Sequence, residues 1–564
     1  MFSLFKIVKR IQAVIPKSYK NKTVRFFIFS LILLVLDIFS IFLLIPLIIS
    51  LLDQDSDFAY LPIKFLKEDK TILITIVVSF FLIKNYIAIH INKYQAKIAY
   101  QLSSEYSLSL SKYYILGNYI AFKKQKKSSI IKEIIFVAND FVGNVLLSVN
   151  IIFSEFALLF FICLIGLYYY FTITLIAVVI LGLIVYLSRY YNRKTIDRIN
   201  KTKSDDYDKN ISNLNNLLNG FMSIKSSDLL NHFLDSFNNS NKKLNHNYSI
   251  LHSKRINSSK QTEILMVIIL CSVFIFINFF SLKGISAVML LSVFGALFFK
   301  AIPSINKLNI SLTNLNSHLY ALDIIEKKIT SISKIASDTA LLKFDFYIKL
   351  EDISFSYKKN KPLFKNLNII INKGEFIAIT GVSGIGKTTL LNIISKLIDS
   401  NSGSIYVDNT KVTNTNKYNY FNLITYLTQS PFIYEGTILD NLVLSNKKVD
   451  EDEINKMLKA LDLLEIINQL PKKLYTYIGS DGSNLSGGQL QRLCIARALL
   501  FKPEILILDE ATNNLDKNTE RKVLHFLKYF IKENNTTIIS VSHHLENEQN
   551  IFNTIIDLDQ YYEV

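Results

Sequence analysis

A glycine-rich segment at residues 381–389 reads Gly-Val-Ser-Gly-Ile-Gly-Lys-Thr-Thr, and it lies between the apolar run 376–380 and an apolar stretch typical of a helix. A strand, a glycine loop and a helix start form the context that a P-loop requires. In such a loop backbone N–H groups surround phosphate oxygens, Lys387 reaches the β and γ phosphates, and the Thr388 hydroxyl is a ligand for magnesium. The chain is therefore predicted to bind a nucleoside triphosphate through Gly381, Ser383, Gly384, Gly386, Lys387, Thr388 and Thr389.

Two further motifs follow later in the chain. The first is Leu485-Ser-Gly-Gly-Gln489, and the second is Ile505-Leu-Ile-Leu-Asp509-Glu510. Together with the P-loop, this set resembles the ATP-binding cassette (ABC) ATPases. Backbone and hydroxyl donors at a helix start form a site for an anion, and the resemblance implies that this anion is the γ-phosphate of an ATP molecule held by another subunit. A homodimer that sandwiches two ATP molecules is therefore expected, with these signature contacts: Ser486, Gly487, Gly488 and Gln489.

The Asp509–Glu510 pair ends an aliphatic run that is predicted to be a strand. At this place one carboxylate can hold the magnesium shell and the next residue can polarise the attacking water as a general base. We therefore predict Asp509 as a metal ligand and Glu510 as the catalytic base. The family resemblance implies three more roles: Tyr357 stacks on adenine, Gln429 touches magnesium and links the ATPase to the membrane domain, and His543 contacts the γ-phosphate.

A few positions near these motifs differ from the family pattern. Ser480 stands where an acidic residue usually precedes the signature, although Asp481 is adjacent. His544 stands where the family often has Arg, so a peripheral contact is expected to differ. The loop 511–516 has an unusual Asn-Asn pair but retains Asp516, which the resemblance places at the ATP site. The expected cofactors are ATP and Mg²⁺.

The apolar content of the chain indicates a membrane protein. Half of the 564 residues are hydrophobic, and they are concentrated before residue 312. This part carries six apolar segments near the roughly 20 residues that a membrane helix needs: 26–52, 71–91, 145–168, 173–187, 263–280 and 285–299. The third and fourth are separated only by a weak break at 168–171. An even number of spans places both chain ends on one side of the membrane.

The formal net charge of +17 is distributed unevenly. Basic residues cluster before the first span and after the fourth, and the positive-inside tendency predicts that these segments and both termini are cytoplasmic. Membrane topology explains the positive charge, so nucleic-acid binding is not expected. The first span is too long for a cleaved signal peptide, so it is expected to remain as a helix. The predicted location is a bacterial cytoplasmic membrane, with the lipid bilayer as a partner.

The predicted fold is multidomain. An all-α polytopic membrane domain of the ABC exporter type, with six transmembrane helices, precedes an α/β P-loop nucleotide-binding domain. The polar stretches 93–140 and 190–260 show helical apolar spacing, and the resemblance implies cytoplasmic extensions that turn through coupling helices near 116–127 and 215–227. The expected boundaries are an amphipathic elbow helix at 1–22, the transmembrane domain at 23–312, a linker at 313–342 and the ATPase domain at 343–564, whose first strands are predicted at 344–350 and 353–355.

Charged residues inside the spans are the local clues to the cargo, because intramembrane charges usually face a cavity or pair with one another. Helix packing explains such residues equally well. The segments 37–46, 154–155 and 300–304 resemble the lipid-linked oligosaccharide flippases among ABC exporters, whose short external helix would fall within 57–70. A buried pyrophosphate needs a compensating cation. The cargo candidates are Asp37, Lys84, Glu155, Glu263 and Lys300.

Two classes of function remain open from the sequence. The first is an ATP-driven exporter or flippase, whose amphipathic cargo is a lipid-linked glycan, another lipid or a small antimicrobial peptide. No cysteine-protease domain precedes the first span, which disfavours exporters that cleave a leader peptide. The second class is a regulated channel or sensor of the ABC type. The presence of both Glu510 and His543 argues against this second class.

Overall fold

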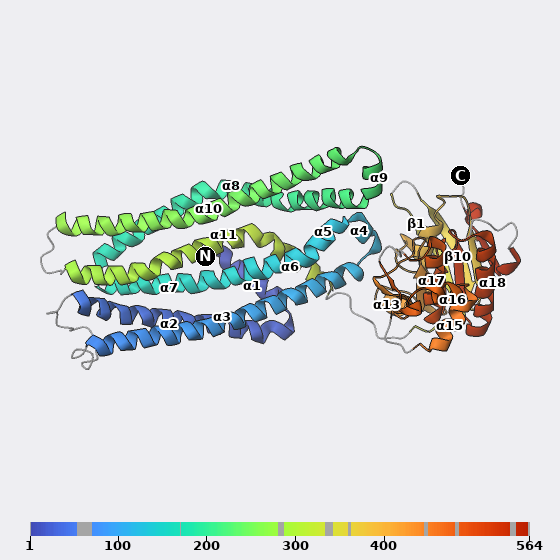
Figure 1. Cartoon of the computed structure of the whole chain (residues 1–564), viewed down its shortest axis with the longest axis horizontal. Coiled ribbons are helices and arrows are strands. Elements are labelled where there is room, and N and C mark those ends of the chain that lie inside the picture. The colour runs from blue at the N-terminus through green and yellow to red at the C-terminus, as the bar shows by residue number, and fades with distance from the viewer. Residues whose placement is uncertain are drawn as a thin grey trace. The chain divides into compact units, whose positions relative to one another are not determined.

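The computed structural model describes residues 2–52, 70–169, 171–279, 287–332, 342–358, 362–444, 449–479, 484–541 and 549–561. The chain divides into two compact units, Met1–Gly117 with Phe122–Ser333, and Asn118–Ala121 with Lys334–Val564. The first unit is built from long helices, and the second combines strands with helices (Figure 1). A helical domain followed by an α/β domain is the order that the sequence predicts.

Six long helices dominate the described part of the first unit. Each predicted membrane span overlaps a different one of them, and the break expected at 168–171 falls between the third and the fourth. Pro46 and Pro303 lie inside two of these helices, where each removes a backbone N–H donor. The six helices are α2 (Lys20–Leu52), α3 (Lys70–Ile115), α7 (Leu147–Tyr169), α8 (Phe171–Asn219), α10 (Leu230–Phe279) and α11 (Ala287–Ile332).

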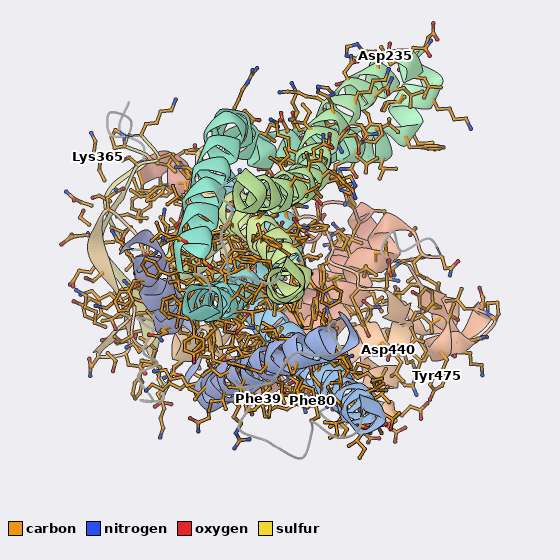
Figure 2. All side chains as sticks on the ribbon, turned by 90° about the vertical axis from the view of Figure 1, so that its left-hand side faces the viewer. Phe39, Phe80, Asp235, Lys365, Asp440 and Tyr475 are labelled. Atoms are coloured by element: carbon orange, nitrogen blue, oxygen red, sulfur yellow. The ribbon has the colours of Figure 1, made fainter. Side chains whose placement is uncertain are left out.

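Three helical segments in the described residues are long and apolar enough to cross a membrane. They are Lys17–Ile48, Thr71–Ile115 and Lys127–Tyr168. Their outer surfaces expose large apolar side chains, as expected where lipid is the solvent; Phe39 on α2, for example, is 57% exposed (Figure 2). The described residues thus support three spans, and the total of six remains a prediction.

A series of short helical elements leads from α3 to α7. The two segments η3 and η4 are π-helical, and such turns often occur at functional positions. In η3 the Glu133 carboxylate accepts a hydrogen bond from Tyr114 of α3 and forms an ion pair with Lys328 of α11. This contact joins three parts of the unit. The elements are α4 (Tyr119–Lys124), α5 (Lys127–Lys132), η3 (Glu133–Val137), α6 (Ala138–Asp140) and η4 (Phe141–Leu146); η1 (Lys17–Tyr19) and α9 (Phe221–Ser226) lie elsewhere.

The helix α1 (Phe2–Val14) covers the segment predicted to be amphipathic. Ile11, Val14 and Ile15 are buried against the helices of the same unit. The Arg10 guanidinium donates to Glu326 of α11 and to Asp323 at 2.5 Å. Much of the apolar face of α1 is therefore packed against protein.

The described residues of the second unit form three sheets. An antiparallel sheet has the strand order β2-β1-β4-β5, a parallel sheet has the order β11-β3-β10-β9-β6, and β7 pairs with β8. The strands are β1 (Tyr347–Phe355), β2 (Phe364–Asn372), β3 (Phe376–Thr380), β4 (Ser402–Val407), β5 (Thr410–Lys411), β6 (Ile424–Leu427), β7 (Gly436–Thr437), β8 (Tyr477–Ile478), β9 (Ile505–Leu508), β10 (Thr537–Val541) and β11 (Thr554–Asp557). The helices are α12 (Lys387–Ile394), α13 (Lys417–Phe421), α14 (Ile438–Leu442), α15 (Glu451–Ala460), α16 (Leu464–Gln469), α17 (Gly487–Leu500) and α18 (Lys517–Asn534), with 3₁₀ turns η5 (Lys473–Tyr475), η6 (Gln549–Ile551) and η7 (Leu558–Tyr561).

The apolar runs of the sequence become the central strands of the parallel sheet. Strands β9 and β10 are buried at every position, as expected for a parallel sheet covered on both faces. Because β3, β6, β9 and β10 run parallel, the P-loop, Gln429 and Asp509 all follow carboxyl ends of strands at one edge of this sheet. Ligands bind at this edge in open α/β sheets.

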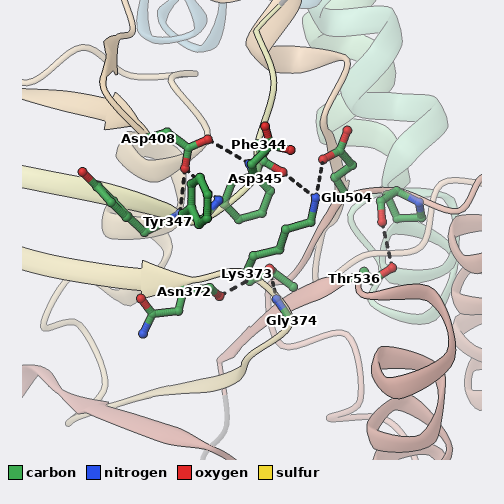
Figure 3. A network of polar contacts seen from close by, with 12 residues as sticks. Phe344, Asp345, Tyr347, Asn372, Lys373, Gly374, Asp408, Glu504 and Thr536 are labelled. Atoms are coloured by element: carbon green, nitrogen blue, oxygen red, sulfur yellow. Dashed lines mark hydrogen bonds and ion pairs between the residues drawn. The ribbon is translucent and has the colours of Figure 1, made fainter.

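The antiparallel sheet differs in one detail from the prediction. Instead of two strands at 344–350 and 353–355, one strand β1 runs through an irregularity at Asp352, where φ is 51°. Figure 3 shows how the start of β1 is fixed: Asp408 accepts backbone N–H bonds from Asp345, Phe346 and Tyr347, each at 2.8 Å. The predicted break between two strands is thus a bulge within a single strand.

Candidate active site

The P-loop joins β3 to α12. Gly381, Gly384 and Gly386 have φ values of 135°, 87° and 113°, in the left-handed region that residues with a Cβ atom rarely adopt. A Cβ atom on Gly386 would also lie 2.9 Å from the Leu363 side chain. Glycine at this position therefore lets the chain enter α12 with the first N–H groups of the helix available to an anion.

Lys387 is the first residue of α12 and is buried. Its Nζ donates hydrogen bonds to Gly381 O at 2.7 Å and to Val382 O at 3.3 Å. The ammonium group therefore lies across the glycine loop. An ammonium has three donors, so this arrangement suits a lysine that binds phosphate oxygens within the loop.

A carboxylate and two hydroxyls meet at the carboxyl end of β9. The Thr388 hydroxyl donates to Asp509 Oδ1 at 3.0 Å, and the Tyr426 hydroxyl of β6 donates to Asp509 Oδ2 at 3.0 Å. Burial, together with the Asp509 carboxylate, raises the pKa of Tyr426 far above its ordinary value, so its hydroxyl remains a donor at neutral pH. Tyr426 thus fixes the orientation of Asp509.

The oxygens of Thr388 and Asp509 fit a magnesium ion. Magnesium prefers hard oxygen ligands, and in nucleotide-binding sites one or two carboxylates share it with water and phosphate. In the part of the chain that the structure describes, no cluster of three or more His, Cys, Asp or Glu residues could hold a metal. Gln429, the third predicted magnesium ligand, donates a hydrogen bond from Nε2 to Glu510 Oε2 at 2.8 Å.

Glu510 follows Asp509 with a φ of 54°, which is uncommon for a residue other than glycine. Its Oε2 atom accepts hydrogen bonds from Gln429 Nε2 at 2.8 Å and from Asn513 Nδ2 at 3.0 Å. Two amide donors from different loops therefore fix one oxygen of this carboxylate. In the sequence, Asn513 stands out only as a departure from the family pattern. The signal for Tyr426 is a polar residue inside a short apolar strand, which does not by itself predict a site residue.

Tyr357 lies beside the P-loop helix. Its side chain is 59% exposed, its hydroxyl is 3.2 Å from Thr389 Oγ1, and its ring meets Phe355 edge to face at 4.9 Å. These two contacts hold the ring while most of its surface remains accessible. An exposed, fixed aromatic ring next to a phosphate loop is suited to stacking on a nucleotide base.

The signature motif forms the beginning of α17. Ser486 is the N-cap, its hydroxyl accepts from Gln489 N, and Gln489 Oε1 accepts from Ser486 N at 2.7 Å. This capping box sets the helix entry, so that Gly487 and Gly488 occupy the first turn, where N–H groups lack partners within the helix. Asp516 caps the next helix, α18, and accepts a hydrogen bond from Thr519 N at 3.0 Å.

Some predicted positions lie outside the described residues. These are His543 and His544, the Ser480–Asp481 pair and most of the segment 57–70 that was predicted to hold the short external helix. Glu263 belongs to α10, but its side chain is also outside the described set. The roles predicted for these residues stay predictions.

Three of the five cargo candidates meet at one place in the helical unit. Asp37 Oδ1 accepts from Lys300 Nζ at 2.7 Å and also from Lys84 Nζ. The three residues belong to α2, α11 and α3. Glu155 of α7 is not part of this cluster, because it pairs with Lys307 at 3.0 Å. We call Asp37, Lys84 and Lys300 the charged cluster.

An apolar cavity of about 430 Å³ lies between α7, α8 and α11. Its volume falls in the range of about 300–1,000 Å³ that is typical of small-molecule pockets. Ala301, which follows Lys300 of the charged cluster, is one of its lining residues. Other lining residues are Phe160, Cys163, Val178, Phe294 and Phe298.

Comparison with known proteins identifies the class of the second unit. Residues 364–513 match the family model described as ABC transporter. The chain is 39% identical over 218 residues to an ATP-dependent lipid A-core flippase of Desulfotalea psychrophila, over 39% of this chain and 38% of that protein. It is 38% identical over 203 residues to a lactococcin-G-processing and transport ATP-binding protein of Lactococcus lactis, over 36% of this chain and 28% of that protein.

A third relative is an ABC multidrug transporter of Emericella nidulans, 36% identical over 215 residues, which cover 35% of this chain and 17% of that protein. The match to these three relatives thus covers less than two fifths of the length of each. The second unit contains an ABC transporter domain, as the sequence motifs predict.

A solved structure extends the likeness to the whole fold. It is a bacterial Atm1-family ABC exporter with ATP bound, with a TM-score of 0.77 and 15% identity, over 96% of this chain and 94% of that chain. The chain therefore has the ABC exporter fold, a helical domain followed by one ABC transporter domain. The resemblance to ABC exporter half-transporters is confirmed.

Proposed function

We propose that this chain is one subunit of a homodimeric, ATP-driven exporter or flippase of a bacterial cytoplasmic membrane. The observation that carries the proposal is the union in one chain of an exporter-type helical unit and an ABC transporter domain whose Thr388, Asp509 and Glu510 lie at one sheet edge. The six predicted spans, with both termini in the cytoplasm, complete the proposal. In this reading ATP binding and hydrolysis in the second unit drive alternating access in the first.

The proposed chemistry is the attack of water on the γ-phosphate of ATP. Thr388 and Asp509 would hold Mg²⁺, which would neutralise the charge that develops on the phosphates. Glu510 orients the attacking water and accepts its proton. Gln429 and Asn513 donate hydrogen bonds to Glu510 Oε2. These bonds fix the carboxylate, so that its other oxygen, Oε1, is directed toward the attacking water.

Other residues bind the nucleotide in this proposal. Lys387 and the P-loop N–H groups hold the β and γ phosphates, and Tyr357 stacks on adenine. Ser486 and the two following glycines contact the ATP that the partner subunit holds. Asp516 also contributes to this ATP site. His543 contacts the γ-phosphate. Two equivalent sites form, one at each P-loop of the dimer.

The proposed cargo is amphipathic, and a lipid-linked oligosaccharide fits best. The charged cluster has two ammonium groups for one carboxylate, so it favours an anionic group such as pyrophosphate. The cavity beside Ala301 is lined almost entirely by apolar side chains, which suits a hydrocarbon chain. A similar protein carries the name lipid A-core flippase, which is consistent with a glycolipid cargo.

A small peptide is the alternative cargo. The relative from Lactococcus lactis is named as a lactococcin-G-processing and transport protein, so similarity to named relatives does not by itself distinguish the two cargoes. A regulated channel or sensor is the less favoured alternative. It would use ATP without being stimulated by a transported substrate.

Stimulation of ATPase activity tests the proposal. The purified protein in proteoliposomes should hydrolyse ATP faster when a polyprenyl-pyrophosphate-linked glycan is added. The variants Lys84→Gln and Lys300→Gln should lose this stimulation but keep basal hydrolysis. Lys307→Gln is the matched control, because Lys307 lies on the same helix as Lys300 but pairs with Glu155. Stimulation by a peptide and not by the glycan lipid would replace the flippase assignment with peptide export.

A further inference from the structure

The charged cluster has an unusual composition: two ammonium groups share a single carboxylate oxygen. Lys84 and Lys300 both donate to Asp37 Oδ1. The exposed fractions of the Lys84, Lys300 and Asp37 side chains are 7%, 18% and 29%. Among the residues that the structure describes, these three groups form no other ion pair.

The charges of the cluster do not cancel. Two lysines and one aspartate leave one excess positive charge at residues inside or directly next to the predicted membrane spans. A charge removed from water is costly unless it is paired and hydrogen-bonded. Asp37 offsets the cost for one ammonium, and it also reduces the repulsion between Lys84 and Lys300, which lie at the same oxygen. The cluster is therefore a site for a further negative charge.

We propose that Asp37 is an internal counter-ion, which a phosphate-bearing ligand displaces from Lys84 and Lys300. The inference rests on the proposed function in that it takes the charged cluster as the cargo site, and it adds how that site responds to cargo. A pyrophosphate offers more acceptor oxygens and more negative charge than one carboxylate, so it is the stronger partner for two ammonium groups.

Displacement of Asp37 changes the links between helices. In the structure Asp37 ties α2 to α3 through Lys84 and ties α2 to α11 through Lys300. When the two lysines bind phosphate, Asp37 loses both partners and is repelled by the phosphate charge. The position of α2 relative to α3 and α11 then depends on whether an anionic ligand is present. A ligand that binds one arrangement better than the other shifts the equilibrium between them.

Anion affinity in the absence of hydrolysis tests the inference. The dissociation constants of inorganic pyrophosphate and of a prenyl pyrophosphate are measured by calorimetry on the full chain in nanodiscs. All proteins carry Lys387→Ala, so that the P-loop does not bind the probe, and a prenyl alcohol is the uncharged control. Asp37→Asn preserves the shape of the side chain and one acceptor oxygen while it removes the competing charge.

The inference predicts that Asp37→Asn binds both pyrophosphate probes about tenfold more tightly or better, since an attractive charge within hydrogen-bond distance of the lysines has been removed. Asp37→Glu keeps the charge and should retain the parental affinity, which also shows that the position tolerates substitution. Adding Lys84→Gln to Asp37→Asn returns the cluster to one positive charge and should bring the affinity back toward the parent. Glu105→Gln removes a carboxylate of α3 outside the cluster and should have no effect.

Unchanged or weaker pyrophosphate binding by Asp37→Asn, with a folded Asp37→Glu protein, would overturn the inference. Tighter binding of the prenyl pyrophosphate alone would assign the site to a lipid headgroup, and tighter binding of both probes would assign it to phosphate in general. The proposed function fails by a different result, the absence of ATPase stimulation by a glycan lipid in the parent protein. The two failures are therefore distinguishable.

Discussion

Replacement of Glu510 by glutamine probes the hydrolytic chemistry. In the structure Glu510 Oε2 faces two amide donors, Gln429 Nε2 and Asn513 Nδ2. A glutamine at this position places its amide oxygen there, because only the oxygen accepts hydrogen bonds. Its NH₂ group then occupies the place of Oε1 and presents N–H donors to the attacking water. The variant keeps the shape and the two contacts, but it cannot accept a proton.

Loss of a general base lowers a rate by about 10²- to 10⁴-fold, which corresponds to about 2.7–5.4 kcal/mol in the activation free energy. ATP hydrolysis by Glu510→Gln should fall within this range when phosphate release is measured at saturating ATP, while ATP binding by calorimetry stays at the parental level. Glu504→Gln is the matched control, since Glu504 precedes the other end of β9 and pairs with Lys373, and its rate should remain within about twofold of the parent.

A parental hydrolysis rate in Glu510→Gln would refute the assignment of the base. Asn513→Ser gives an intermediate check, because it removes one of the two donors that hold the carboxylate. Its kcat should decrease with little change in ATP affinity. A decrease in affinity with an unchanged kcat would mean that Asn513 acts on nucleotide binding and does not position Glu510.

Three further predictions concern the second unit. Lys387→Ala should weaken ATP binding, because it removes the ammonium that lies across the P-loop; an unchanged dissociation constant would exclude that role. Cysteines at Ser383 and Ser486 should form a disulfide between chains when ATP is bound in a Glu510→Gln background, whereas a product that remains monomeric on a non-reducing gel would contradict the sandwich dimer. Burial opposes the ionisation of Asp408, but three backbone N–H donors outweigh it and hold its pKa below the ordinary value. The contribution of this carboxylate to stability is therefore present at neutral pH and is lost as the pH falls through its lowered pKa. Asp408→Asn should destabilise the ATPase domain by about 1 kcal/mol at pH 7 and much less in acid, as measured by thermal unfolding. An equal loss of stability at both pH values would contradict this role of Asp408.

Much of the ATPase domain was predictable from local sequence. The glycine spacing before Lys387 and the aliphatic run before Asp509 each specify a strand followed by a functional turn, and parallel pairing then brings the carboxyl ends of β3 and β9 to one edge. The predicted break in β1 was wrong because a bulge at Asp352 interrupts the pattern but not the strand. The hydrogen bonds of Tyr426 and Asn513 depend on how neighbouring loops meet, which periodicity does not encode.

The charged cluster was predictable only as separate residues. Charge inside or at the end of an apolar span singled out Asp37, Lys84 and Lys300, but the pairing of Asp37 with Lys300 joins positions 263 residues apart. Hydropathy gives the length of each helix and leaves open its rotation and its depth relative to the others. The same limit explains why Glu155 was grouped with these residues although it pairs with Lys307.

Translocation by the reconstituted protein tests the central claim most directly. A polyprenyl-pyrophosphate-linked glycan with a radiolabelled sugar is placed in proteoliposomes, and the fraction accessible to a glycan-cleaving enzyme from outside is followed before and after ATP is added. The account predicts an ATP-dependent change in this fraction with the parent protein and none with Glu510→Gln at equal protein incorporation. An accessible fraction that stays constant with the parent protein while ATP is hydrolysed would contradict the proposed flippase.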